Sequence, residues 1–212
     1  MGLKERRERE KDAVRTKILD AARELFAAQG YEGVSMRAVA EKIEYSPTVI
    51  YQYFKDKETL IQELCYADFR KLAEQLQDTM KIPDPIERLR QCGRDYVRFA
   101  INFPNHYRLM FMTPMPAYDH QADQDEGKGN PETDAYALVR LLVQMAWEQG
   151  ALRDPNADLD LVAQTLWAGI HGVVALHLVM GCDEEWTPWK PLDTRVEAML
   201  DALGGGVFKE RR

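Results

Sequence analysis

The sequence has little that would support a secreted, disulfide-bonded or metal-binding protein. Its three cysteines, Cys65, Cys92 and Cys182, are too few and too scattered for a disulfide framework, and no two of them stand at metal-ligand spacing. This favours a reducing compartment. The first twelve residues, MGLKERREREKD, are almost continuously charged and therefore lack the apolar core of a secretory signal. We expect a cytoplasmic protein without a bound metal.

Motifs for catalysis are equally scarce. There is no phosphate-binding glycine loop, no nucleophile elbow and no paired His-Glu motif. The four histidines are His106, His120, His171 and His177. The last two are six positions apart on one predicted helix, which separates them by roughly 120° in direction, so they do not converge on a ligand. We expect no catalytic residues and no cofactor.

Sustained alternation of apolar and polar residues, the mark of a half-buried strand, is also nearly absent. Apolar residues recur instead at steps of three and four along most of the chain, as on one face of a helix. With 212 residues and 45% hydrophobic content, the chain is long and apolar enough to bury a core. These features predict an all-α fold.

Negative charge dominates the chain, but it is unevenly distributed. Residues 1–60 hold 12 basic and 11 acidic side chains, whereas the remaining residues hold 16 and 24. Only the N-terminal third is therefore electrostatically suited to approach a polyanion. The alternative on charge alone is an ordinary solvated surface.

A pair of short helices is predicted within this N-terminal third. A first helix is expected to end at Gly30, and Ser35 is a good N-cap for a second helix of about two turns. After a break at Glu44 and Tyr45, Ser46 can cap a third helix, with Pro47 at its first position, that runs to about Phe54. Two short helices joined by a tight turn are typical of a helix-turn-helix, whose second helix enters the DNA major groove; the same pair also occurs as plain structure.

The surrounding residues resemble a known family. Residues 16–64, TKILDAARELFAAQGYEGVSMRAVAEKIEYSPTVIYQYFKDKETLIQEL, are similar along their whole length to the DNA-binding region of TetR/AcrR-type repressors. The resemblance includes the segment FAAQGYEGVS, the Ser-Pro-Thr start of the recognition helix, its Tyr-Gln-Tyr-Phe end and the Lys-Asp-Lys-Glu that opens a fourth helix. It implies an operator of double-stranded DNA as the partner.

Nine residues carry the DNA contacts that the resemblance implies. Ser35 and Arg37 of the second helix contact phosphates or neighbouring bases. Four residues lie against base edges: Ser46, Pro47, Thr48 and Gln52. Three grip phosphates: Tyr51, Tyr53 and Lys57. The alternative for Tyr53 is core packing, and for Lys57 a solvated position in the first turn of its helix, although a cation there opposes the helix dipole and an external anion would explain it.

Two positions depart from the family pattern. Members often carry glycine in the turn and histidine just before the terminal phenylalanine, whereas this chain has Glu44 and Tyr53. Glutamate can adopt the backbone of the turn at modest cost, and its charge beside the DNA face would lower the affinity.

The rest of the chain is predicted to form a larger helical domain. We expect a DNA-binding domain over residues 1–56 and an effector-binding and dimerisation domain over 57–212, with a long helix opened by Asp56 at the junction and another opened by Asp84-Pro85. Residues 113–134 are rich in Pro, Gly and Asp, which predicts a mobile loop. Three further helices are expected over about 133–149, 158–180 and 193–203, with the last ended by Gly204–Gly206.

The predicted helix over 158–180 is apolar on nearly every side and has no formal charge from Val162 to Met180. It must therefore be buried on more than one side. A transmembrane span is one reading, but Gln164 and two histidines inside it and acidic flanks without a basic anchor disfavour it. We expect instead a homodimer whose four-helix interface is built from helices 158–180 and 193–203 of each subunit, with no membrane partner.

A second resemblance concerns the C-terminal domain. LWAGIHGVVALHL, residues 166–178, together with FPNHYRLMF at 103–111, is similar to the Trp-His-Gly subtype of TetR C-terminal domains. In such domains this region forms the effector pocket and the dimer surface. The candidate pocket residues are aromatic, thioether and imidazole side chains: Phe103, Tyr107, Met110, Phe111, Trp147, Trp167 and His171. Ordinary core packing is the alternative for each of them.

The function implied is that of a transcriptional repressor released from its operator by an unknown small-molecule effector, acting in the cytoplasm on the bacterial nucleoid. The alternative is a constitutive DNA-binding regulator without a ligand. The large second domain, with its interior rich in aromatic residues and methionine, favours the first.

Overall fold

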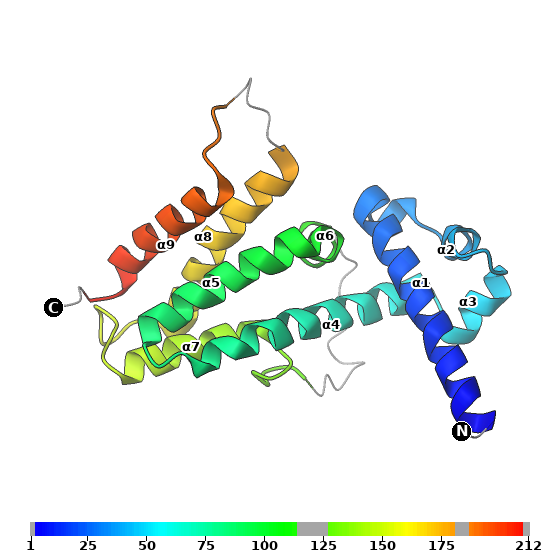
Figure 1. Ribbon diagram of the computed structural model, residues 1–212, viewed down its shortest axis with the longest axis horizontal. Helices are drawn as coiled ribbons and strands as arrows, with labels where there is room; N and C mark the ends of the chain where they lie inside the picture. The colour runs from blue at the N-terminus through cyan, green and yellow to red at the C-terminus, as the bar shows by residue number, and fades with distance from the viewer. Residues whose placement is uncertain (1–2, 114–126, 181–186, 210–212) are drawn as a thin grey trace. The chain divides into compact units, whose positions relative to one another are not determined.

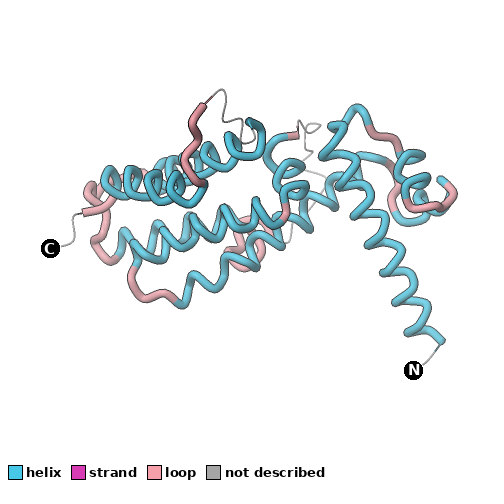
Figure 2. Tube along the Cα trace, turned by 45° about the horizontal axis from the view of Figure 1, so that its top comes forward, coloured by secondary structure: helices cyan, strands magenta, loops and turns pink. Residues whose placement is uncertain are grey.

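The computed structural model describes residues 3–113, 127–180 and 187–209. Within these ranges the chain is helical, and its only β-type pairing is an isolated bridge between Leu152 and Phe208. Figure 2 shows helices joined by short loops, without a strand in the described segments. The predicted all-α fold is confirmed.

Internal contacts divide the chain into two compact units. The N-terminal unit comprises Met1–Phe69 and Asn105–Gln124, and the C-terminal unit comprises Arg70–Pro104 and Asp125–Arg212. The predicted domain boundary, after residue 56, falls at the start of helix α4 (Lys57–Leu76), which contributes residues to both units. Helix α6 (Pro104–Met112) lies almost wholly in the N-terminal unit.

Three helices and the start of α4 build the N-terminal unit around one core (Figure 1). They are α1 (Leu3–Gly33), α2 (Met36–Lys42) and α3 (Pro47–Tyr53). The predicted stop at Gly30 is confirmed, because its φ of 71° and ψ of 175° interrupt the helix before a last turn. Phe26, Ile50 and Phe54 are fully buried in this core, and Leu109 of α6 joins it.

Caps and turns explain where these short helices begin. The Ser35 hydroxyl accepts a hydrogen bond from the Ala38 amide at 3.1 Å, as predicted for the N-cap of α2. Asp56 caps α4 in the same way, by accepting from the Thr59 amide at 2.8 Å. Ser46 occupies the N-cap position of α3, but the predicted capping bond is wrong: its side chain makes none. Pro47 stands at the first turn of α3, as predicted.

The C-terminal unit is a bundle of longer helices. After the 3₁₀ helix η1 (Gln77–Lys81), these are α5 (Pro85–Asn102), α7 (Ala135–Glu148), α8 (Leu159–Met180) and α9 (Leu192–Val207). Helix α5 packs against α7, α8 and α9, and α8 packs against both α7 and α9. Most of the predicted mobile loop, residues 114–126, lies outside the described residues.

The predicted end of the last helix is wrong. Helix α9 continues through Gly204–Gly206 to Val207, and none of these three glycines has a positive φ. The buried Phe208 explains the difference: its amide donates to the Gly204 carbonyl at 2.9 Å, and it pairs with Leu152. Tertiary contacts at the C-terminal end of the helix thus outweigh the low helix propensity of glycine.

Candidate nucleic-acid interface and ligand cavity

Helix α3 has one buried side and one exposed side. Ile50, and Phe54 just after the helix, are fully buried in the core of the N-terminal unit and hold the helix in place. On the opposite side the predicted contact residues are exposed: Ser46, Pro47, Thr48, Tyr51 and Gln52. Tyr51 leaves 55% of its surface exposed and extends away from the core. The face displays hydroxyl and amide groups that bond phosphate oxygens and base edges.

The turn before α3 is formed by a residue in the left-handed region. Glu44 has φ 61°, the one positive φ among the described residues other than glycine. The Tyr45 amide donates to the Ala40 carbonyl at 3.0 Å and closes the turn. This turn sets the angle between α2 and α3. Ser35, the N-cap of α2, and Arg37 in its first turn are both exposed. Arg37 lies near Glu41 at 3.8 Å, and its side chain stays largely in solvent.

The two remaining predicted DNA-contact residues are half-buried. Tyr53 packs against the core of the N-terminal unit and, with Gln52, also lines a polar groove beside α1. Lys57 donates hydrogen bonds to the carbonyls of Tyr31 and Val34 at 3.0 and 3.1 Å, and its ammonium lies 4.1 Å from the centre of the Tyr31 ring. These internal contacts account for a cation at the start of α4 without an external anion.

A buried ionic cluster, which the sequence analysis missed, joins three helices of the N-terminal unit. Asp68 of α4 has only 1% of its side chain exposed and accepts hydrogen bonds from Arg23 of α1 at 2.8 to 3.1 Å. Its Oδ1 also lies 2.9 Å from Nδ1 of His106 on α6. A bidentate, desolvated pair of this kind fixes helix positions firmly. No motif announces it, because the three residues are far apart in the sequence.

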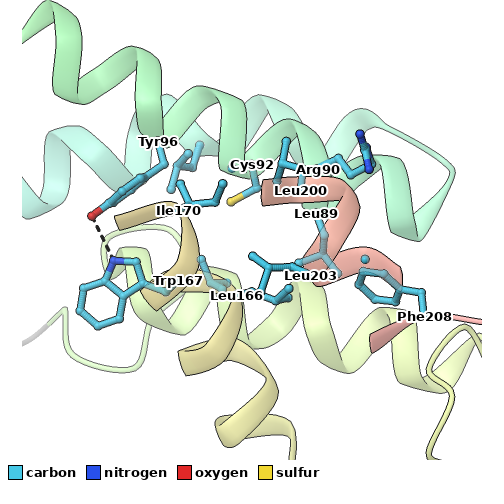
Figure 3. Close-up of a pocket in the computed structure, with 14 residues that line it drawn as sticks. Leu89, Arg90, Cys92, Tyr96, Leu166, Trp167, Ile170, Leu200, Leu203 and Phe208 are labelled. Carbon is cyan, nitrogen blue, oxygen red and sulfur yellow. Dashed lines mark hydrogen bonds between the residues drawn. The ribbon is translucent and has the colours of Figure 1, made fainter. Parts of the chain in front are cut away.

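The C-terminal unit contains an apolar cavity of about 60 Å³ between α5, α8 and α9. Figure 3 shows Cys92 and Leu89 of α5 facing Leu200 and Leu203 of α9, with Trp167 of α8 at one end. Trp167 Nε1 donates to the Tyr96 hydroxyl at 3.1 Å, and that hydroxyl lies 3.1 Å from Nδ1 of His171.

Only one of the predicted pocket residues, Trp167, lines this cavity; His171 lies behind it in contact with Tyr96. Phe103 packs against Phe99 and lies under the Lys71 ammonium. Trp147 is exposed and donates to the Pro155 carbonyl at 2.7 Å.

The other three predicted pocket residues, Tyr107, Met110 and Phe111, belong to the N-terminal unit, where Tyr107 packs against Phe111 at 4.9 Å between ring centres. The cavity residues that the ligand prediction missed come mainly from α5 and α9. Of these, Leu89, Gly93 and Tyr96 share one face of α5, a pattern that the sequence does carry.

Comparison with known proteins agrees with this architecture. Residues 18–64 match the family described as "Bacterial regulatory proteins, tetR family", and residues 89–203 match "Tetracyclin repressor-like, C-terminal domain". The HTH-type transcriptional regulator UidR of Escherichia coli (strain K12) is 33% identical over 197 residues, covering 78% of this chain and 95% of UidR. None of these matches bears on the Trp-His-Gly subtype, which stays a prediction.

Solved structures share the fold. A TetR family transcription regulator from Marinobacter aquaeolei VT8 superposes with a TM-score of 0.74 at 19% identity, covering 96% of this chain and 100% of that one. The fatty acid degradation regulator FadR from Bacillus halodurans gives 0.72 at 18% identity, covering 91% and 95%. With its exposed recognition helix, helical C-terminal unit and matches over both regions, this chain belongs to the tetR family of bacterial regulatory proteins, which are DNA-binding transcriptional regulators that act as dimers with small-molecule effectors.

Proposed function

We propose that this chain is a homodimeric repressor that binds its operator through α3 and leaves it when an effector binds in the C-terminal unit. The observation that carries the DNA-binding part is the exposed polar face of α3 on a rigidly packed core. A side chain as large as Tyr51, held outward by a helix whose opposite side is fully buried, is positioned for contact with a phosphate or base.

The family resemblance suggests specific roles, and the exposure of these residues is compatible with them. In this proposal Ser46, Pro47, Thr48 and Gln52, at and just after the start of α3, face base edges, and Tyr51 contacts the flanking phosphate. Ser35 uses its oxygen to cap α2 and keeps its hydroxyl proton for a phosphate, and Arg37 extends into solvent beside it. Tyr53 and Lys57 support these contacts from a half-buried position.

The dimer surface is proposed on α8 and α9. Along α8 an uncovered stripe recurs every three or four residues: Leu161, Thr165, Ala168, Leu176 and Val179 are exposed, and Gly172 between them is half-buried. Its apolar ends are strongly exposed, at 62% for Leu161 and 63% for Val179. Small residues in the middle of the stripe allow a second helix to approach closely. On α9 the exposed face is also largely small, with Thr194, Ala198, Ala202 and Gly205.

Helix α8 is also the one described helix with the length and hydropathy of a membrane span, and 22% of its most apolar window is buried within the chain. A twin subunit covers such a face without a membrane. This supports a dimer that works in the cytoplasm, on the DNA of the nucleoid.

Effector release follows from geometry. A dimer binds two half-sites only when its recognition helices are separated by about one helical repeat of DNA, roughly 34 to 36 Å, or by a multiple of it. An effector that binds more tightly to the state with another separation empties the operator.

The test is binding of the purified protein to a labelled fragment of its own upstream DNA at low and moderate salt. Wild type is expected to bind in a salt-dependent manner, and a Tyr51→Ala, Gln52→Ala double variant to bind roughly ten- to a hundredfold more weakly. Tyr136→Ala, which removes an exposed tyrosine from α7, is the matched control and should bind like wild type. Equal binding by the double variant would contradict the assignment of α3.

One observation favours the alternative, a constitutive regulator without a ligand: the cavity of about 60 Å³ is smaller than an ordinary ligand pocket, about 300 to 1,000 Å³. Thermal denaturation with a panel of small molecules distinguishes an effector-released repressor from a constitutive regulator. A constitutive regulator shows no ligand-induced rise in Tm and the same operator affinity throughout.

A further inference from the structure

The chemical character of the cavity in the C-terminal unit restricts what it can bind. Its lining is aliphatic and aromatic, with Cys92, Tyr96 and Trp167 as the polar exceptions besides one charged residue, Arg90. Burial raises the pKa of the Cys92 thiol to about 12, so this group stays protonated and neutral. The lining therefore carries no anion.

The charge of Arg90 is already balanced. Its guanidinium bonds Glu197 at 3.0 Å and Asp201 at 2.8 Å. Glu197 is also bonded by Arg94 at 2.7 Å, a hydrogen bond that lowers the pKa of the Glu197 carboxyl and keeps it ionised. An anionic ligand would have to compete with two carboxylates, and a cationic ligand would meet no carboxylate in the lining. Burying either without a partner is costly.

The polar end of the cavity is neutral as well. The Tyr96 hydroxyl joins Trp167 to His171, and burial lowers the pKa of His171, which favours the uncharged imidazole near neutral pH. A ligand group placed here meets the Tyr96 hydroxyl and the Trp167 indole, which suit a hydroxyl or carbonyl.

The size of the cavity decides how a ligand enters. About 60 Å³ is below the roughly 150 Å³ of a protein cavity known to take benzene. The boundary can give way at two leucines of α9, whose ends touch glycine backbones: a Cβ on Gly93 would lie 2.9 Å from Leu200 Cδ2, and one on Gly169 would lie 2.7 Å from Leu203 Cδ1. The backbones of α5 and α8 are close-packed at these two contacts, so volume added there comes from movement of the two leucines of α9.

We propose that this cavity binds a compact, uncharged, largely apolar molecule with one hydrogen-bonding group, and that the ligand makes room by displacing Leu200 and Leu203 of α9. This inference rests on the proposed function, in which the C-terminal unit holds the effector site. Because the proposed dimer surface lies on α8 and α9, the displacement couples ligand binding to the contact between subunits.

The test uses three ring compounds of one size and different charge: cyclohexanol, cyclohexanecarboxylate and cyclohexylammonium. Near neutral pH, cyclohexanol at about ten times its Kd is expected to raise the Tm by roughly 3 to 6 °C, and the two ions to leave it unchanged. Backbone amide hydrogen exchange over residues 192–207 should change on cyclohexanol binding. The inference is overturned if the ions stabilise as well as cyclohexanol, or if cyclohexanol does not stabilise at all.

Variants at two cysteines locate the site. Cys92→Met fills the cavity and should abolish the cyclohexanol shift, whereas the same substitution at Cys65, in the N-terminal unit, should preserve it. Cys92→Ala enlarges the cavity and should tighten cyclohexanol binding. This second variant tests the location of the site if Cys92→Met does not fold. An unchanged shift in Cys92→Met, or unchanged affinity in Cys92→Ala, contradicts the assignment.

Operator binding by the same preparations keeps the two proposals apart. If the protein binds its operator but not cyclohexanol, only the ligand assignment of the cavity is contradicted. If it binds cyclohexanol but no DNA, the proposed DNA-binding function is contradicted and the ligand assignment stands.

Discussion

At the residue scale, the angle of the recognition helix depends on the backbone of Glu44. A residue with a Cβ pays roughly 1 to 2 kcal/mol to adopt the left-handed conformation, which Glu44 holds at φ 61°. Resemblance to the family pointed to this position, because glycine is common there. The chain thus retains a strained backbone conformation in the turn before α3.

Replacing Glu44 by glycine should stabilise the protein by about 0.5 to 1 kcal/mol. The substitution relieves the backbone strain, and part of this gain is offset because glycine has a larger conformational entropy in the unfolded chain. Thermal or urea denaturation measures this. Glu44→Ala is the control, since it removes the same charge and keeps the strain. Equal stability of the two variants would show that charge and not backbone conformation is responsible.

Asp68 is a second residue on which much depends. It is buried, and it holds Arg23 and His106 from two other helices. Asp68→Ala should lower the free energy of unfolding by about 3 to 5 kcal/mol, because it leaves the Arg23 guanidinium buried without its main partner. Asp20→Ala, which removes an exposed carboxylate bonded to the same guanidinium at 2.7 Å, should cost no more than about 1 kcal/mol. Urea titration distinguishes the two; similar losses would mean that burial of Asp68 adds nothing.

His171 makes stability depend on pH. Burial lowers the pKa of His171 in the folded chain, so the unfolded chain binds more protons as the pH falls through the unfolded value of about 6.5. The contribution of His171 to the free energy of unfolding is complete above a pH of about 6.5 and is lost progressively as the pH falls below it. His171→Asn should therefore reduce the drop in Tm between about pH 7.5 and 5.5. Tyr96→Phe removes the same hydrogen bond but keeps the imidazole, and its drop should match that of wild type; an unchanged drop in His171→Asn would contradict this.

At the scale of elements, glycines on α8 and α9 have different surroundings, which distinguishes the effect of helix propensity from the effect of packing between helices. A Cβ on Gly205 or Gly206 of α9 would meet open space, whereas one on Gly169 of α8 would meet Leu203 at 2.7 Å and the Met199 sulfur at 3.2 Å. The first two glycines only lower helix propensity. The third is the contact point at which α8 and α9 pack.

Gly206→Ala should therefore stabilise the protein by up to about 1 kcal/mol through helix propensity alone. Gly169→Ala should destabilise it by about 1 to 3 kcal/mol, the usual cost of overpacking a core. Denaturation of both variants at low protein concentration makes the comparison. A stabilising Gly169→Ala would mean that α9 moves away freely.

At the scale of the whole molecule, the uncovered stripe of α8 sets the oligomeric state that we propose. Leu176, half-exposed at 50%, lies near the apolar end of that stripe. A charge introduced there would appear on both subunits of a two-fold dimer and would be buried by association.

Leu176→Glu should weaken dimerisation at least about a hundredfold and weaken operator binding with it, because two half-sites are no longer held together. Light scattering measures the mass. Ile101→Glu places the same charge on another exposed apolar residue, on α5, and should leave the dimer intact. A dimeric Leu176→Glu would exclude this stripe from the interface.

Local chemistry was enough to predict much of the fold, since helix starts depend on side chains next to them in the chain. Ser35, Asp56 and Asp84 each accept a hydrogen bond from the first turn of the helix they precede, and Gly30 adopts the positive φ that interrupts α1 before its last turn. The helix-turn-helix was predictable for the same reason. There are two exceptions. Helix α9 runs through three glycines because contacts of Phe208 compete with local preference, and Ser46 lacks its capping bond without a structural explanation.

The helices, the exposed face of α3 and the family could be predicted from the sequence, because each depends on residues close together in the chain. Which side chains meet across helices depends on the tertiary structure. It assigned the Lys57 ammonium to the Tyr31 and Val34 carbonyls, joined Arg23, Asp68 and His106, and built the cavity from α5, α8 and α9, while only Trp167 of the predicted pocket residues lines it. The physical reason is that helical periodicity shows which face of a helix is buried but not which neighbour covers it.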